Sequence, residues 1–222
     1  MQLNELETPV LVLDRNRMDR NIARLRERLA PFGVALRPHV KTNKSADVAR
    51  RLGPAGTPIT VSTLKEAEYF LDHGWTDILY AVGIVPSKLP HVERLARRGA
   101  RLTLILDNAE AAAATSAYAR DHDLQLPVLI EIDTDGHRSG VKPEDPVLLD
   151  VAARLFAREG EGAWVAGVLA HAGDSYNCRS TEAIAAMAEP ERAGAVRAAQ
   201  RLREAGHAAP VVSVGSPPTA PF

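Results

Sequence analysis

The sequence predicts an α/β protein whose parallel sheet curves into a (β/α)8 barrel of the TIM type. Short β-branched runs alternate with longer helical patterns along the chain, which is typical of a parallel sheet with helical crossovers. A doubly wound open sheet also fits this alternation. The barrel is favoured because polar residues follow many of the expected strands, and in a barrel these strand ends meet at one face. They are His39 and Lys41, Ser62, Asp107, Glu131 and Asp133, His171, and Ser213.

Eight strands are expected from the apolar runs. The first is short and precedes a helix, and the second leads directly into Lys41. The expected strands are residues 10–13, 34–40, 59–62, 77–82, 102–106, 128–132, 165–170 and 211–214.

Seven helices are expected between these strands. The first carries apolar residues at spacings of four, three and four from Met18 to Leu29, which line one helical face, and Asp14 caps its start. The third begins with a capping box formed by Thr63 and Glu66. The helices lie between residues 14 and 31, at 45–52, from 63 to 74, at 86–98, from the fifth strand to about 120, at 145–158 and at 181–205.

The element count predicts a barrel that is incomplete. A complete barrel of this class has about 250 residues, whereas this chain has 222 and ends in the loop-like SPPTAPF. We therefore expect one barrel domain over residues 1–222. Either residues 10–13 close the barrel, or that strand belongs elsewhere and the last barrel strand is missing; we expect the second.

Composition excludes several classes of function. The net charge of -1 gives no electrostatic footprint for nucleic acid or an anionic membrane. No apolar run approaches the roughly 18 residues of a membrane span, and the N-terminus lacks a signal-peptide pattern. Cys178 is the single cysteine, so an internal disulfide is impossible. We expect a cytoplasmic protein with a small-molecule partner.

Lys41 is the first residue whose side chain could take part in a reaction. It follows the strand VALRPHV and stands two residues after His39. A lysine amine at a barrel-strand end can form a Schiff base. On residue type alone a surface lysine is the more frequent interpretation, because the chain has 27 basic residues.

Two strand-end segments add an arginine and a histidine. In EIDTDGHRSGV the turn at Gly136 directs Arg138 toward the strand-end face, where a guanidinium can hold an anionic oxygen. In HAGDSY, His171 can stack on or bond a planar cofactor. A turn arginine and a core histidine are the simpler alternatives. Asp174 near His171 also permits a metal site, but two ligands without a third are weak support.

The last strand is followed by Gly215 and Ser216. Small residues there let backbone N–H groups approach an anion, and barrels frequently bind phosphate in the loops after strands seven and eight. Together the four segments supply an amine, an arginine, an imidazole and an anion site. Pyridoxal phosphate requires these parts.

The segments RPHVKTNKS, EIDTDGHRSGV, HAGDSY and VSVGSPPTA resemble the barrel domain of the D-threonine aldolase and D-serine dehydratase family. That family belongs to the alanine-racemase-like, fold-type III pyridoxal-phosphate enzymes. The resemblance covers nearly the whole chain. It implies a lyase acting on D-β-hydroxy amino acids, a (β/α)8 barrel of the alanine racemase N-terminal kind, and a homodimer.

The resemblance also implies residue roles. Lys41 is the lysine that forms the Schiff base with pyridoxal phosphate, next to His39, and Arg138 contacts the cofactor ring oxygen. His171 and Tyr176 line the cofactor. Gly215 and Ser216 belong to the phosphate loop. This chain departs from the family at Asn43, Asp174 and Pro217, which puts substrate handling and phosphate affinity in question.

Family members continue into a last strand and a C-terminal β domain, which holds a divalent metal and takes in an N-terminal strand, here within residues 1–13. No residue of this chain is assigned to the metal, so we expect little or no turnover from it alone. Two alternatives stay open: a non-catalytic pyridoxal-phosphate-binding barrel in cofactor homeostasis, and an amino-acid racemase. The sequence leaves the D-amino acid, the choice between aldolase and dehydratase, and the oligomeric state open.

Overall fold

The computed structural model describes residues 2–155 and 160–222. Contacts along the chain divide it into two units, one up to Leu36 and one from Arg37 onward. The smaller unit contains the 3-10 helix η1 (Leu3–Glu5), the helix α1 (Arg15–Leu29) and the 3-10 helix η2 (Ala30–Phe32). The larger unit contains all the strands and every predicted site residue.

Helix α1 begins and ends where the sequence predicts. The Asp14 side chain accepts a hydrogen bond from the Arg17 N–H at 2.9 Å, which caps the helix. Gly33, with a φ of 62°, ends the following η2 turn in the left-handed region.

The strand predicted at residues 10–13 does not form. These residues are exposed, Leu11 fully so, and the described residues provide no strand beside them. An extended segment becomes a strand only when a neighbour satisfies its N–H and C=O groups. The assignment of this segment to a further β domain remains a prediction.

The larger unit is built on one parallel sheet. Its six strands are hydrogen-bonded in sequence order, β1 to β6, and every pairing is parallel. The strands are β1 (Ile59–Val61), β2 (Asp77–Tyr80), β3 (Arg101–Leu106), β4 (Leu126–Ile132), β5 (Ala163–Ala170) and β6 (Val211–Ser213). A doubly wound sheet reverses its strand order, whereas a barrel adds each strand to the same side. The sheet is therefore part of a barrel.

The strand predicted at residues 34–40 is reduced to one bridge, between His39 and Thr60. The Val40 N–H donates to the Thr60 carbonyl at 2.9 Å, and the Thr60 N–H donates to the Pro38 carbonyl at 2.9 Å. Lys41 follows immediately. The bridge therefore holds Lys41 beside β1, as a full strand would.

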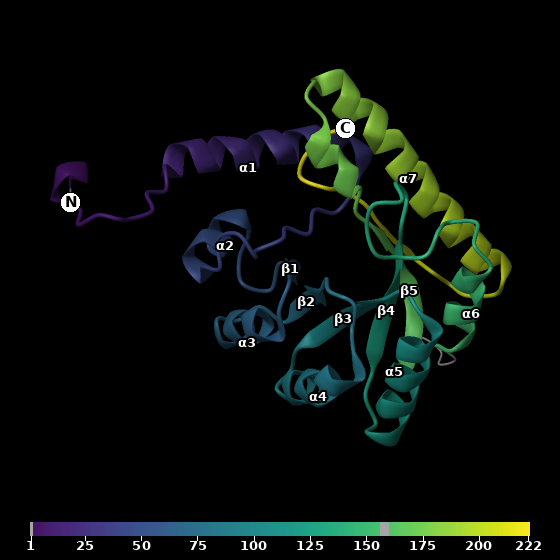
Figure 1. Cartoon of the computed structure of the whole chain (residues 1–222). Coiled ribbons are helices and arrows are strands. Elements are labelled where there is room, and N and C mark those ends of the chain that lie inside the picture. Colours follow the sequence, from purple (N-terminus) through teal and green to yellow (C-terminus); the bar gives the residue numbers. More distant parts are fainter. Residues whose placement is uncertain (1, 156–159) are drawn as a thin grey trace. The chain divides into compact units, whose positions relative to one another are not determined.

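Helices follow the strands of this unit, as Figure 1 shows. The prediction of a Thr63–Glu66 capping box is confirmed, and both of its hydrogen bonds form. The helix expected at 145–158 is shorter in the structure, and residues 156–158 lie outside the described part. The helices are α2 (Ala46–Leu52), α3 (Leu64–Asp72), α4 (Leu89–Arg97) after the 3-10 turn η3 (Pro86–Lys88), α5 (Ala109–Asp121), α6 (Val147–Ala153), η4 (Gly173–Asn177) and α7 (Thr181–Glu204).

Side-chain alternation divides the sheet between two apolar layers. The main core contains residues such as Ile78, Leu104 and Val128 together with buried helix residues. The opposite face carries a smaller cluster of Leu79, Ile105, Leu129 and Ala166. Successive residues of a strand point to opposite faces. Leu79, Ile105 and Leu129 therefore identify the inner face of the part-barrel.

Glycine at position 167 permits the pairing of β5 with β6. Gly167 has a φ of +148°, and it lies where the β4–β5 register shifts. It pairs with Val211, and a Cβ at this position would overlap the Val211 carbonyl oxygen. A side chain here would push β6, and the loop that follows it, away from β5.

We predict that Gly167→Ala lowers the free energy of unfolding by about 2–4 kcal/mol, because it adds a backbone clash in a conformation that disfavours side chains. Urea unfolding monitored by circular dichroism measures this. Gly83→Ala is the control, since a Cβ there meets nothing within 4 Å. Equal unfolding midpoints for the two variants would show that β6 does not depend on this glycine.

Candidate functional site

The predicted site residues gather at the carboxyl edge of the sheet. Lys41 follows the bridge at His39, Arg138 lies in the loop after β4, His171 directly follows β5, and Gly215 lies two residues after β6. Carboxyl ends of parallel strands share one edge, so segments far apart in sequence become neighbours there.

His39 is held between Lys41 and Ser62. Its Nδ1 accepts the Lys41 backbone N–H at 3.3 Å, and its Nε2 lies 3.2 Å from the Ser62 Oγ. With Nδ1 as acceptor, the neutral ring carries its proton on Nε2 and donates to Ser62. The ring orientation is thus tied to the backbone of the predicted catalytic lysine.

Burial first, and the positive charge of Lys41 next, lower the pKa of His39 from 6.5 to about 4. His171 contributes a smaller lowering. His39 is therefore a neutral imidazole at pH 7.

His171 connects three of the predicted segments. Burial lowers its pKa, and the charges of Arg138 and Lys41 add to that lowering, while a hydrogen bond with the Gly215 backbone opposes it. The Tyr176 ring lies with its centroid 5.9 Å from that of His171, tilted by 32°. The two rings are thus neighbours.

Arg138 lies against the loop that follows β5. A Cβ added at Gly173 would overlap the Arg138 Cδ and Cγ, so the aliphatic part of Arg138 rests on a glycine. The side chain is exposed. Its guanidinium is near enough to influence both His171 and Glu131.

The predicted phosphate loop, at Gly215 and Ser216, is hydrogen-bonded to other parts of the protein. Gly215 has a φ of +120°, and its N–H donates to the Glu191 Oε1 at 3.3 Å. Ser216 is buried, its N–H donates to the Thr219 Oγ1 at 3.0 Å, and its Oγ lies 2.6 Å from the Ser175 Oγ. The loop therefore stands beside the His171 segment, and these donors bond to protein acceptors.

Two buried carboxylates were not predicted as site residues. Glu131, at the end of β4, has a raised pKa because of burial first and the nearby charge of Asp107 next. Glu191 lies on α7 and is 2% exposed. A signal for Glu191 exists in the sequence, because it stands four residues before Ala195 on the face that also carries Ala198, Ala199 and Leu202.

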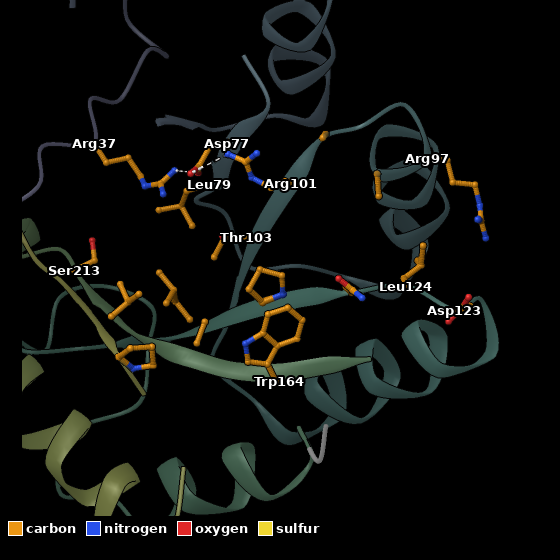
Figure 2. Close-up of a pocket in the computed structure, with 18 residues that line it drawn as sticks. Arg37, Asp77, Leu79, Arg97, Arg101, Thr103, Asp123, Leu124, Trp164 and Ser213 are labelled. Carbon is orange, nitrogen blue, oxygen red and sulfur yellow. Dashed lines mark hydrogen bonds and ion pairs between the residues drawn. The ribbon is translucent and has the colours of Figure 1, made fainter. Parts of the chain in front are cut away.

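A cavity of about 610 Å³ lies on the inner face, toward the amino ends of the strands. Figure 2 shows Asp77 between two arginines, with its Oδ1 2.6 Å from the Arg37 Nη1 and its Oδ2 3.7 Å from the Arg101 Nη2. Trp164, Leu79 and Leu129 give it an apolar wall. None of the residues assigned to the cofactor lines this cavity, but Ser213, which was expected at the carboxyl face, does.

The chemistry of the carboxyl-edge residues fits pyridoxal phosphate. Lys41 offers a primary amine, His39 and His171 offer neutral rings, and Arg138 offers a cation for an anionic oxygen.

Over residues 2–155 and 160–222 we found no group of three or more His, Cys, Asp or Glu side chains suited to a metal ion. Within the same part of the chain, none of the helices combines the length and apolar character of a membrane span.

Residues 13–220 match the family described as alanine racemase, N-terminal domain. The chain is 54% identical to D-threo-3-hydroxyaspartate dehydratase of Delftia sp. (strain HT23) over 97% of its own length and 56% of the relative's. It is 30% identical to D-serine dehydratase of Dictyostelium discoideum, covering 97% of the chain and 57% of that protein. It is 32% identical to D-threonine aldolase of Arthrobacter sp, covering 99% and 58%.

The solved structure of the Delftia dehydratase superposes with a TM-score of 0.92, at 52% identity over 97% of this chain and 57% of that one. The chain thus spans a little over half the length of these relatives. The predicted resemblance is confirmed: the chain belongs to the alanine racemase N-terminal domain family of fold-type III pyridoxal-phosphate enzymes, together with relatives named as D-hydroxy amino acid dehydratases and aldolases.

Proposed function

We propose that this chain is the cofactor-binding part of a pyridoxal-phosphate lyase that dehydrates D-3-hydroxy amino acids, with D-threo-3-hydroxyaspartate as the favoured substrate. The arrangement of Lys41, His39, His171 and Arg138 at one sheet edge supports the cofactor. The 54% identity to a protein named for hydroxyaspartate dehydration supports the reaction and the substrate.

Each residue has a defined task in this proposal. Lys41 holds the cofactor aldehyde, His171 and Tyr176 line the ring, and Arg138 holds its anionic oxygen. Gly215 and Ser216 belong to the loop that would hold the phosphate. When bound, pyridoxal phosphate supplies an electron sink for the bonds at the substrate Cα.

The two neutral imidazoles limit the positive charge of the site. Because His39 and His171 are uncharged at pH 7, the cations at this edge are Lys41 and Arg138. The neutral His171 ring can also accept a proton during turnover. Of the two cations, Lys41 holds the cofactor aldehyde and Arg138 meets an anionic oxygen.

We predict that borohydride reduction of the protein with pyridoxal phosphate leaves a covalent adduct on Lys41, located by peptide mass mapping. Lys41→Arg keeps the positive charge without a primary amine and should abolish the adduct. Lys44→Arg is the matched control, since Lys44 is a nearby lysine paired with Glu66 at 3.3 Å. An adduct that persists in Lys41→Arg would overturn the role of Lys41.

We predict that the protein with pyridoxal phosphate converts D-threo-3-hydroxyaspartate to oxaloacetate and ammonia only slowly, in line with the low turnover expected of this chain alone, and leaves the L-isomer untouched. Mass spectrometry after long incubation detects even slow turnover, and Lys41→Arg supplies the background. Glycine and glyoxylate as products would show that the reaction is aldol cleavage and not dehydration. Appearance of the L-isomer would favour racemisation, and cofactor binding without any product would favour a binding module.

We predict that protein stability falls as pH decreases from about 7 toward 4. The unfolded chain protonates His39 near pH 6.5, whereas the folded protein does so only at about 4, so acid favours the unfolded state between these values. His39→Asn retains an acceptor for the Lys41 N–H and cannot titrate. Between pH 7.5 and 5 it should lose about 1–2 kcal/mol less unfolding free energy than the wild type. Urea titrations at both pH values measure this, and parallel losses would contradict a depressed His39 pKa.

A further inference from the structure

Glu191 is a buried carboxylate that the proposed reaction does not use. It lies near the middle of α7, one residue after Pro190, and is 2% exposed. The neighbours on its helix face are alanines and Leu202. Burial of a carboxylate is costly unless hydrogen bonds satisfy it, so its contacts are informative.

The Glu191 carboxylate accepts hydrogen bonds from two different strand-end loops. Its Oε1 receives the Ala172 N–H at 2.7 Å, from the loop after β5, and the Gly215 N–H at 3.3 Å, from the loop after β6. Its Oε2 receives the Thr219 hydroxyl at 2.7 Å. One side chain therefore fixes the distance between the loop of His171 and the loop of Gly215 and Ser216.

A second set of hydrogen bonds joins the same two loops. The Ser175 Oγ lies 2.6 Å from the Ser216 Oγ and donates to the Ala172 carbonyl at 2.6 Å. The Ser216 Oγ lies 3.0 Å from the Thr219 Oγ1. Ser175, Ser216 and Thr219 are all buried. The two loops thus form one polar network around Glu191, in which each bond is strengthened by exclusion from water.

The neighbouring turn of α7 contacts a third loop. A Cβ at Gly194 would lie 2.8 Å from the Thr134 Cγ2, so the helix approaches the segment that carries Arg138. Glu191 and Gly194 are three residues apart and lie on the same side of the helix. One face of α7 therefore touches the loops after β4, β5 and β6.

We propose that Glu191 is a positioning residue that sets the phosphate loop, Gly215 and Ser216, relative to the ring-lining residue His171. This inference rests on the proposed function, because the loop matters only if the site takes pyridoxal phosphate. A carboxylate suits the task because both of its oxygens accept, whereas an amide keeps one acceptor oxygen and replaces the other by N–H donors. Glutamine at this position would therefore lose either the bond from the Thr219 hydroxyl, which would have to turn to accept, or the bonds from the Ala172 and Gly215 N–H groups.

The phosphate group provides a readout that a general loss of stability would not give. Pyridoxal and pyridoxal phosphate both react with a lysine amine, and only the second uses the phosphate loop. We expect Glu191→Gln to weaken pyridoxal phosphate binding about 10-fold and pyridoxal binding by less than about 2-fold, the cost of one or two buried hydrogen bonds. Absorbance titrations with both compounds measure the ratio.

Glu189→Gln is the matched control. Glu189 is on the same helix, is exposed and pairs with Arg192 at 2.7 Å, so its loss should change neither affinity. If Glu191→Gln fails to fold, Thr219→Val removes one donor to the carboxylate, and Thr219→Ser should restore the selective affinity because it keeps the hydroxyl.

A second measurement does not involve the cofactor. In the protein without cofactor, Glu191→Gln should speed hydrogen–deuterium exchange in both the peptide around Ala172 and the peptide around Gly215. Glu189→Gln should change the exchange of neither peptide. Equal weakening of both pyridoxal compounds, or exchange that quickens in one loop only, would overturn the positioning role. Wild-type protein that binds no pyridoxal phosphate would instead overturn the proposed function, and the role of Glu191 with it.

Discussion

The parallel pairing of β5 with β6 decides where the predicted cofactor residues stand. It places His171 and Gly215 at neighbouring strand ends, where the histidine ring bonds to the Gly215 backbone. The pairing requires glycine at position 167, since any side chain there would meet Val211. Glu191 then fixes the two loops beyond the strand ends. The backbone ladder thus defines the coarse arrangement, and a buried carboxylate defines the spacing.

The charges at this edge depend on how close these residues lie to one another. Lys41, Arg138, His39 and His171 lie near enough to influence one another, and four positive charges together would be strongly repulsive. Burial and the Lys41 charge lower the pKa of both imidazoles, and the Arg138 charge also lowers that of His171, so both rings are neutral at pH 7. The remaining charge suits a ligand with anionic oxygens. Burial also raises the pKa of Glu131, a carboxyl group that the Arg138 charge influences.

Local signals in the sequence predicted most of the helices and the strand-end residues. The caps at Asp14 and Thr63 depend on a few adjacent residues, and the structure forms both of them. The strands expected at 10–13 and 34–40 depend on distant partners, and the chain offers the second only the Thr60 bridge. Glu191 was missed because a glutamate in an alanine-rich helix resembles a surface residue. Only its position on the buried face of α7 distinguishes it from the exposed Glu189.

The residues that gather at the carboxyl edge are suited to holding a cofactor, and they leave the choice of reaction to other groups. A relative named as a dehydratase and one named as an aldolase align with nearly all of this chain, at 30% and 32% identity. Dehydration removes a proton from Cα and expels the β-hydroxyl, whereas aldol cleavage removes the hydroxyl proton and breaks Cα–Cβ. The outcome therefore depends on which substrate atom faces a proton acceptor.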